Sequence, residues 1–315
     1  MKQSHQTTLR AAVSLSGIGV HSGADVRIVL HPAEANHGIV FLRTGLSGGR
    51  ERLIDARHLT VTATELCTVI GDRESGAVAT IEHLMAAFAG LGIDNVLVEI
   101  DGPEVPIMDG SAAPFVDAID QVGVVAVNAS RRFLKILKPV RVTQGRAFAE
   151  LLPNERGFRL DVEINFPTPV IGRQRKAVDL SAAAFRREVS RARTFGFMRD
   201  VEKLWGAGFA LGASLENTVA LGEEGIINPE GLRYADEFVR HKLLDAVGDL
   251  SLAGLPLLAS YRSYCGGHRL NFAVLQALFA KRSNYAIVEA GSRRELGYAD
   301  LSGGIAAPIY ASELH

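Results

Sequence analysis

The sequence predicts an α+β protein built from two domains of similar architecture, each combining a β-sheet with two helices. Three observations support this prediction. The chain has 315 residues, which exceeds the size at which a single hydrophobic core usually divides. Short β-branched runs alternate with amphipathic stretches. Finally, one order of elements, a His-bearing helix, a strand and a Gly-led helix, occurs twice along the chain.

The first predicted domain covers residues 1–126. Its clearest helix runs from Thr80 to Gly90, with Thr80 as the expected N-cap and Gly92 beyond its end. A second helix is expected over 113–122, where Pro114 suits the first turn. Strands are expected in short β-branched runs bounded by turn residues, at 7–15, 24–30, 38–43 and 95–100.

The second predicted domain covers residues 131–290. Its longest helix is expected from about Glu237 to Ala253, and a last helix over 270–280 ends in Lys281 and Arg282, which suit a helix C-terminus. A shorter helix is expected at 181–191. Strands are expected at 133–137, 147–152, 158–166 and 257–264.

An internal repeat relates the two halves. His83 precedes Ser111, which opens the second helix of the first half, by 28 residues, and His241 precedes His268 by 27. A repeat of this kind fixes the architecture, although chance similarity between two helix–strand–helix stretches stays an alternative. A cleft with a ligand site is expected where two such domains face each other.

Composition and charge narrow the class of function. Hydrophobic residues make up 47% of the chain, as in folded proteins, and 34 Lys+Arg balance 35 Asp+Glu. This balance excludes the basic surface of a nucleic-acid-binding protein but permits a small anionic ligand held by a few cations.

Cysteine use and hydropathy indicate the compartment. Two cysteines, Cys67 and Cys265, form no disulfide framework, so a reduced, cytoplasmic compartment is expected. The first ten residues lack the apolar segment of a signal peptide. No apolar run approaches the about 18 residues of a membrane span. We therefore expect no membrane span, while a transient contact with a membrane surface remains compatible.

The segment from 238 to 250 is the most informative for chemistry. His241 and Asp245 are four residues apart, so they share one helix face and can bind one cation, and Asp249 extends this stripe by a turn. Apolar neighbours predict that the helix is buried, where unpaired polar groups cost about 1–3 kcal/mol each. The alternative is a salt-bridged face formed with Arg240 and Lys242.

A second pair, Glu82 and His83, lies in the first turn of the helix at 80–90. A carboxylate beside an imidazole in an apolar helix start is typical of a metal ligand next to a general base. The alternative is that Glu82 favours the helix N-terminus and His83 is a core residue. The zincin pattern His-Glu-x-x-His is absent, which excludes that class of metalloprotease.

Together, His83, His241 and Asp245 form a two-His, one-carboxylate set with an open position, as in catalytic zinc sites. Zn²⁺ and Fe²⁺ both accept such ligands. A metal ion there would lower the pKa of water and polarise a carbonyl, with Glu82 as general base on the metal-bound water. His268 after Gly266-Gly267 is expected to be the general acid or oxyanion stabiliser, or else a surface turn residue. Asp249 would orient His268 or support the metal.

Several long motifs occur in the order in which one known family has them. From about residue 7 to 285 the chain resembles the zinc-dependent UDP-3-O-acyl-N-acetylglucosamine deacetylases of lipid A biosynthesis. The stretches that carry the resemblance are Ser-Gly-Ile-Gly-Val-His-Ser-Gly at 16–23, Thr-Ile-Glu-His-Leu-Met-Ala-Ala at 80–87, Ile-Met-Asp-Gly-Ser-Ala at 107–112, Ser-Arg-Ala-Arg-Thr-Phe-Gly-Phe at 190–197, the segment 236–250, and Gly-Gly-His at 266–268.

The resemblance implies a fold, a reaction and residue roles. The fold is two α/β domains whose helix layers pack against each other between the sheets. The reaction removes acetyl from the 2-amino group of an acylated UDP-sugar. The implied zinc ligands are His83, His241 and Asp245. The implied catalytic groups are Glu82 as base, His268 with its partner Asp249, and Thr194 at the oxyanion. The implied substrate contacts are Lys242, Phe195 and His21.

The family also has an apolar passage for the acyl chain in its second domain. The resemblance assigns this passage to the segment 195–214, whose residues would otherwise read as ordinary core. Thr168 departs from the pattern, because many members have His there, and this puts that contact in doubt. The tail at 292–315 carries no inference. The passage residues singled out are Phe197, Met198, Val201 and Leu204.

Alternative functions remain open at the level of sequence. A sugar-phosphate kinase would suit the Gly-rich turns at 17–19 and 47–49, yet neither is a P-loop. A non-catalytic module that binds a nucleotide-sugar or a lipid, and another metal amidohydrolase, would each fit the same residues.

Overall fold

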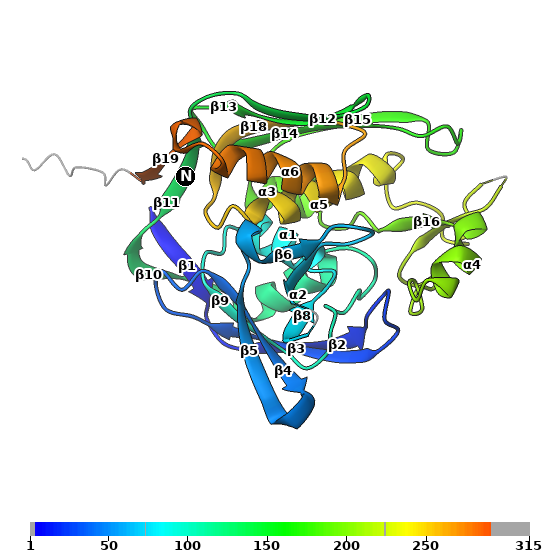
Figure 1. Ribbon diagram of the computed structural model, residues 1–315, viewed down its shortest axis with the longest axis horizontal. Coiled ribbons are helices and arrows are strands. Elements are labelled where there is room, and N and C mark those ends of the chain that lie inside the picture. The colour runs from blue at the N-terminus through cyan, green and yellow to red at the C-terminus, as the bar shows by residue number, and fades with distance from the viewer. Residues whose placement is uncertain (1–3, 73, 224, 291–315) are drawn as a thin grey trace, which may run out of the picture.

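The computed structural model describes residues 4–72, 74–223 and 225–290. Two β-sheets enclose layers of helices between them, and α4 stands apart at one side (Figure 1). The α+β class predicted from the sequence is therefore confirmed. The tail at 292–315 lies outside the described residues. The helices are α1 (Glu82–Leu91), α2 (Ala113–Val122), α3 (Ala182–Glu188), α4 (Met198–Gly206), α5 (Glu237–Ser251) and α6 (His268–Phe279).

The first half contains a five-stranded sheet in the order β2-β3-β9-β4-β5. Its central strand β9 is antiparallel to β3 and parallel to β4. Burial alternates along β3 and β9, as expected when one face of a sheet packs on helices. The strands are β1 (His5–Leu9), β2 (Val13–Ile18), β3 (Asp25–Pro32), β4 (Ile39–Leu46), β5 (Arg50–Asp55), β6 (Val61–Ala63), β7 (Val69–Asp72), β8 (Gly76–Val78), β9 (Val96–Ile100) and β10 (Val124–Ser130).

The second half contains a seven-stranded sheet around β18. β18 is antiparallel to β13 and parallel to both β14 and β11, and β19 forms an edge beside β11. The strands of the whole second half, of which β16 and β17 form a separate pair, are β11 (Arg132–Ile136), β12 (Val140–Gln144), β13 (Ala147–Pro153), β14 (Phe158–Asn165), β15 (Arg173–Asp179), β16 (Phe195–Phe197), β17 (Val219–Leu221), β18 (Leu257–Tyr264) and β19 (Tyr285–Glu289).

The two sheets repeat one topology. The order β12-β13-β18-β14-β15 in the second half matches β2-β3-β9-β4-β5 in the first, and corresponding pairs have the same relative direction. In each half, two helices flank the central strand in sequence, α1 and α2 around β9 and α5 and α6 around β18. The internal repeat predicted from the spacing of histidines is thus a repeat of whole folding units. The boundaries at 126 and 131 stay predictions.

Two expectations for the first half are wrong. The expected strand at 7–15 is two strands, because β1 pairs with β10 whereas β2 pairs with β3 in the main sheet. The N-cap of α1 is Ile81 and not Thr80. Thr80 instead has a positive φ of 56°, and its hydroxyl donates to Glu104 Oε1 at 2.7 Å. Gly92 ends α1 in the left-handed conformation, as expected.

Helices α1 and α5 cross in close contact at Gly248. A Cβ at this position would lie 2.0 Å from the carbonyl oxygen of Glu82, so only glycine permits the crossing. The contact brings the first turn of α1 beside α5, and it thereby joins the two halves of the molecule. Within the described chain, no helix has both the length and the apolar character needed to span a membrane.

Candidate metal centre and active site

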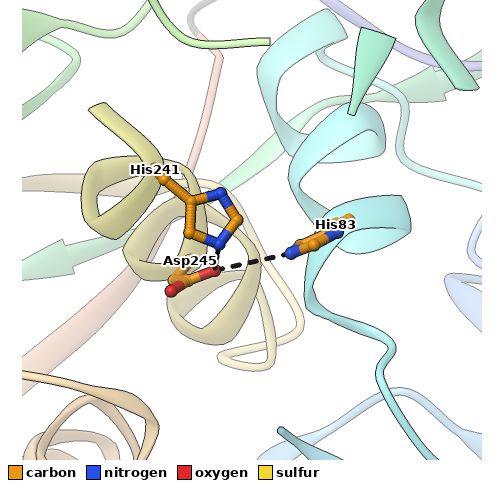
Figure 2. Close-up of side chains that lie close together, drawn as sticks. All are labelled: His83, His241 and Asp245. Carbon is orange, nitrogen blue, oxygen red and sulfur yellow. Dashed lines mark ion pairs between the residues drawn. The ribbon is translucent and has the colours of Figure 1, made fainter. Parts of the chain in front are cut away.

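Three buried side chains from the two crossing helices meet at one point. The ligand atoms of His83, His241 and Asp245 all lie within 4.8 Å of one another. Asp245 Oδ1 is 3.4 Å from His241 Nε2 and 3.7 Å from His83 Nε2. Figure 2 shows His83 reaching from α1 toward the two side chains that project from one face of α5. The i, i+4 spacing read from the sequence thus gives a shared face, and the helix crossing supplies the third group.

The atoms at this point are suited to a divalent cation. His241 Nδ1 donates to the carbonyl of Ala192 at 3.1 Å, which leaves the Nε2 lone pair free. Asp245 Oδ1 is buried without a hydrogen-bond partner in the described structure, as is Nδ1 of His83. An orphaned carboxylate oxygen facing two imidazole nitrogens is costly unless a cation binds there. The donor set therefore fits a metal ion.

The charges of the ligands also fit. Burial lowers the pKa of His83 to about 3, assisted by His241, and burial lowers the pKa of His241 as well. Burial alone would raise the pKa of Asp245, but His241 and Lys242 outweigh it and lower this pKa. Two neutral imidazoles and one carboxylate anion are the protonation states that metal binding requires.

Glu82 lies beside the three potential ligands, in the first turn of α1, and is buried. Its Oε2 accepts from the backbone N–H of Thr68 at 3.0 Å, and its Oε1 is 3.8 Å from His268 Nε2. Burial raises the pKa of Glu82 to about 7, with Asp249 and Asp245 acting in the same direction and His268 opposing them. A carboxylate with a pKa near neutrality is suited to accept and release a proton.

His268 is the first residue of α6, and its side chain faces that of Glu82. Its Nδ1 is 2.8 Å from Asp249 Oδ2, and its Nε2 is 4.0 Å from Asp245 Oδ2. Burial alone would lower the pKa of His268, but Asp249, Glu82 and Asp245 raise it to about 10. These carboxylates favour the protonated form of His268, whose Nε2 faces Glu82 and Asp245.

Two residues that the sequence did not single out fix Asp249. Thr68 Oγ1 donates to Asp249 Oδ1 at 2.7 Å, and Asn271 Nδ2 donates to Oδ2 at 2.8 Å. Asn271 is three residues after His268 on α6, so helical spacing could have indicated it. Thr68 lies just before β7, in a stretch without periodicity, and no sequence pattern marks it.

Lys242 and Phe195 border the cluster. Lys242 Nζ donates to Asp245 Oδ2 at 2.8 Å and lies 5.7 Å from the centre of the Phe195 ring. Phe195 in turn meets the ring of His241 edge-on at 6.2 Å. Thr194 precedes Phe195, and its backbone N–H donates to the carbonyl of Gly110. The motif at 194–195 therefore joins the turn before α2 to the site.

His21 lies in the turn between β2 and β3. Burial lowers its pKa, Glu104 raises it, and His268 lowers it further. The buried carboxylate of Glu104, missed by the sequence reasoning, accepts from the N–H groups of His21 and Ser22 and from the hydroxyl of Thr80. Glu104 thereby links this turn to the segment that leads into α1.

The predicted acyl-passage residues lie on β16 and α4. None of the side chains of α4 is buried. Val201 and Leu204 are partly exposed and Met198 is 46% exposed. The alternative interpretation of these residues as ordinary buried core is therefore wrong for α4. Thr168 lies in the turn between β14 and β15, where its carbonyl accepts from Ile171 and Gly172.

Comparison with known proteins agrees with this geometry. The LpxC family model, UDP-3-O-acyl N-acetylglycosamine deacetylase, matches residues 6–280. The chain belongs to this family. Curated proteins named UDP-3-O-acyl-N-acetylglucosamine deacetylase from Brucella ovis, Brucella canis and Brucella abortus are each 52% identical over 287 residues, covering 91% of this chain and 99% of theirs.

The family predicted from the sequence motifs is confirmed. The LpxC match includes every residue of the cluster described above, from His21 to His268. Membership of this family implies a metal-dependent deacetylase. In the described structure, His83, His241 and Asp245 form a group that could hold a metal ion.

Proposed function

We propose that this chain hydrolyses the acetamide at the 2-amino group of UDP-3-O-acyl-N-acetylglucosamine, the committed deacetylation of lipid A biosynthesis. One observation carries the proposal: within a deacetylase family match, a buried two-His, one-carboxylate cluster is flanked by a carboxylate, Glu82, and a cationic imidazole, His268. Amide hydrolysis requires an activated water and a protonated leaving amine, and this pair of groups suits both needs.

His83, His241 and Asp245 would hold the metal, which we propose is Zn²⁺, with Fe²⁺ as the alternative that the same ligands accept. When bound, the ion supplies a Lewis acid that polarises the amide carbonyl and acidifies water. The carbonyl of Ala192 orients the His241 ring through Nδ1, and Lys242 holds the second oxygen of Asp245. Both contacts fix the directions of the ligand atoms.

Glu82 and His268 move the protons in this proposal. Glu82 takes a proton from the attacking water through Oε1, since Oε2 is engaged by Thr68. His268 keeps Nδ1 on Asp249, so the proton on Nε2 is available for the leaving amine. The hydroxyl of Thr194 would donate a hydrogen bond to the developing oxyanion.

The substrate contacts are also part of the proposal. Lys242 and Phe195 border the cluster. Together with His21, they would contact the sugar and its anionic group. Phe197, Met198, Val201 and Leu204 would line the passage for the acyl chain. The exposed apolar side chains around α4, among them Trp205 at 54% exposure, suit an amphiphilic substrate taken from a membrane surface. A cytoplasmic location fits two free cysteines.

Acetate release from UDP-3-O-acyl-N-acetylglucosamine tests this function. We expect release of one acetate per amine formed, and a kcat/KM lower by at least about tenfold for the sugar lacking the acyl chain, because the passage then contributes no binding. Substrate binding by metal-loaded protein without acetate release would instead identify a non-catalytic nucleotide-sugar-binding module.

Asp249→Asn tests how His268 is kept charged. Asp249 is the partner that raises the pKa of His268 most, so its neutralisation should lower this pKa. Because the acid must be protonated, activity is lost as pH rises through the His268 pKa. The alkaline limb of the pH–rate profile should therefore move to lower pH, with kcat reduced by about 10-fold or more. An alkaline limb at its wild-type position would show that Asp249 is only structural.

A further inference from the structure

A cavity of about 410 Å³ lies between the two halves of the molecule, away from the site described above. None of the proposed metal ligands, nor Glu82 or His268, is among its lining residues. It is formed at the carboxyl ends of α1 and α5, with walls from β1 and β11. These strands lie on the side of the molecule opposite α4 (Figure 1). The cavity is therefore distinct from both the active site and the proposed acyl passage.

The interior of the cavity is apolar. Phe88 and Leu91 of α1, Leu250 of α5, and Phe133 and Phe158 of the second sheet contribute to its lining. Its volume is within the about 300–1,000 Å³ of small-molecule sites. A hydrocarbon chain in an apolar space of this size would gain dispersion contacts with the walls.

Cations lie along the lining. Arg57 is exposed, and its guanidinium lies close to Gly254, where an added Cβ would be 3.1 Å from Nη1. Arg132 has a buried Nε without a hydrogen-bond partner among the described residues, and its Nη2 contacts Asn36 Oδ1 at 3.3 Å. In the described structure no carboxylate forms an ion pair with either arginine, so their N–H groups suit an incoming anion.

The net charge of the lining limits the anion. Its third arginine, Arg131, pairs with Asp94 at 2.9 Å, and the exposed Asp55 is the remaining carboxylate of the lining. Three arginines against two aspartates leave one positive charge. A monoanionic head group is thus favoured over a dianionic phosphate monoester.

We propose that this cavity is a second binding site, which accepts a single-chain aliphatic carboxylate. The chain occupies the apolar space at the ends of α1 and α5, and the carboxylate contacts Arg57 and Arg132. An amphiphile of this class matches the two features of the cavity, an apolar interior and two guanidinium groups that form no ion pair within the described structure.

Calorimetric titration of the metal-loaded full chain with dodecanoate, below its micelle concentration, tests the proposal. We expect saturable binding that is at least about tenfold weaker in Arg57→Gln. Ala89→Phe, which places a ring in the cavity from α1, should abolish binding. The exposed Lys138 does not line the cavity, so Lys138→Gln should bind like the wild type. Absence of saturable binding, or equal binding by all variants, would overturn the proposal.

The proposed acyl passage on α4 is the competing location for a fatty chain, and Leu204→Glu separates the two. Dodecanoate binding should persist in Leu204→Glu and be lost in Ala89→Phe. The reverse pattern would assign binding to α4 and overturn the proposal. Dodecanol, which lacks the charge, and dodecyl phosphate, which carries more of it, should both bind more weakly. Tighter binding of the phosphate would refute the carboxylate assignment.

Discussion

Replacing Asp245 with alanine is expected to remove both the bound metal and the deacetylase activity. Asp245 Oδ1 faces the Nε2 atoms of His83 and His241, so its loss leaves two neutral donors and no anionic ligand. We expect less than about a tenth of the wild-type metal content and a fall in kcat/KM of at least about 10³-fold. Elemental analysis and acetate release on the same preparation provide the measurement.

Two further variants make this result specific. Asp245 also pairs with Lys242, so His83→Ala, which leaves that pair intact, should lose metal and activity to a similar degree. His31 pairs with Glu99 outside the site and is partly exposed. His31→Ala should therefore retain both metal and activity. Full metal content in His83→Ala would contradict the assignment of the ligands.

Replacing Glu82 with glutamine should separate metal binding from catalysis. The side-chain oxygen of glutamine can still accept from the N–H of Thr68, so α1 and the metal should stay in place. The amide cannot accept the proton of the attacking water, and kcat should fall by about 10²–10⁴-fold. The measurement is kcat at full metal loading, with Glu99→Gln, outside the site, as the matched control.

The pH dependence of the activity also tests Glu82 as the general base. Because burial raises the pKa of Glu82 to about 7, wild-type activity should rise with pH as this carboxyl ionises, and Glu82→Gln should lack that limb. An unchanged rate with metal fully bound would remove Glu82 from the role of base.

The candidate site was predictable where one helix supplies neighbouring groups. The spacing of His241 and Asp245 predicts a shared face from 3.6-residue periodicity, and α5 presents them so. The pairing of His83 with this face depends on the helix crossing at Gly248. That crossing is a tertiary contact, which the periodicity of one helix does not encode. Only the combination of residue types and family motifs predicts that His83 shares a site with His241 and Asp245.

Groups that act through loops were not predictable. Glu104 holds Thr80 in a positive-φ conformation, and this long-range bond overrides the local preference of threonine for an N-cap. Thr68 contacts both Glu82 and Asp249 from a position without any periodic signal. The strand pairing that separates β1 from β2 likewise depends on β10, far away in the sequence.

The fold was predictable to the level of its repeat. Two similar distances between histidines indicated two similar halves, and the sheets share the strand order around β9 and β18. Edge strands such as β15 and β19 and the exposed helix α4 carry weaker patterns, because short or solvent-facing elements lack a continuous apolar face.

The most direct test of the central claim, that a metal held by His83, His241 and Asp245 drives amide hydrolysis, is a titration. Zn²⁺ is added to metal-stripped protein while acetate release from UDP-3-O-acyl-N-acetylglucosamine is followed. We predict negligible release without metal and a rise to a plateau at about one equivalent per chain. Near-full deacetylation by the stripped protein, with metal absent by elemental analysis, would contradict the account.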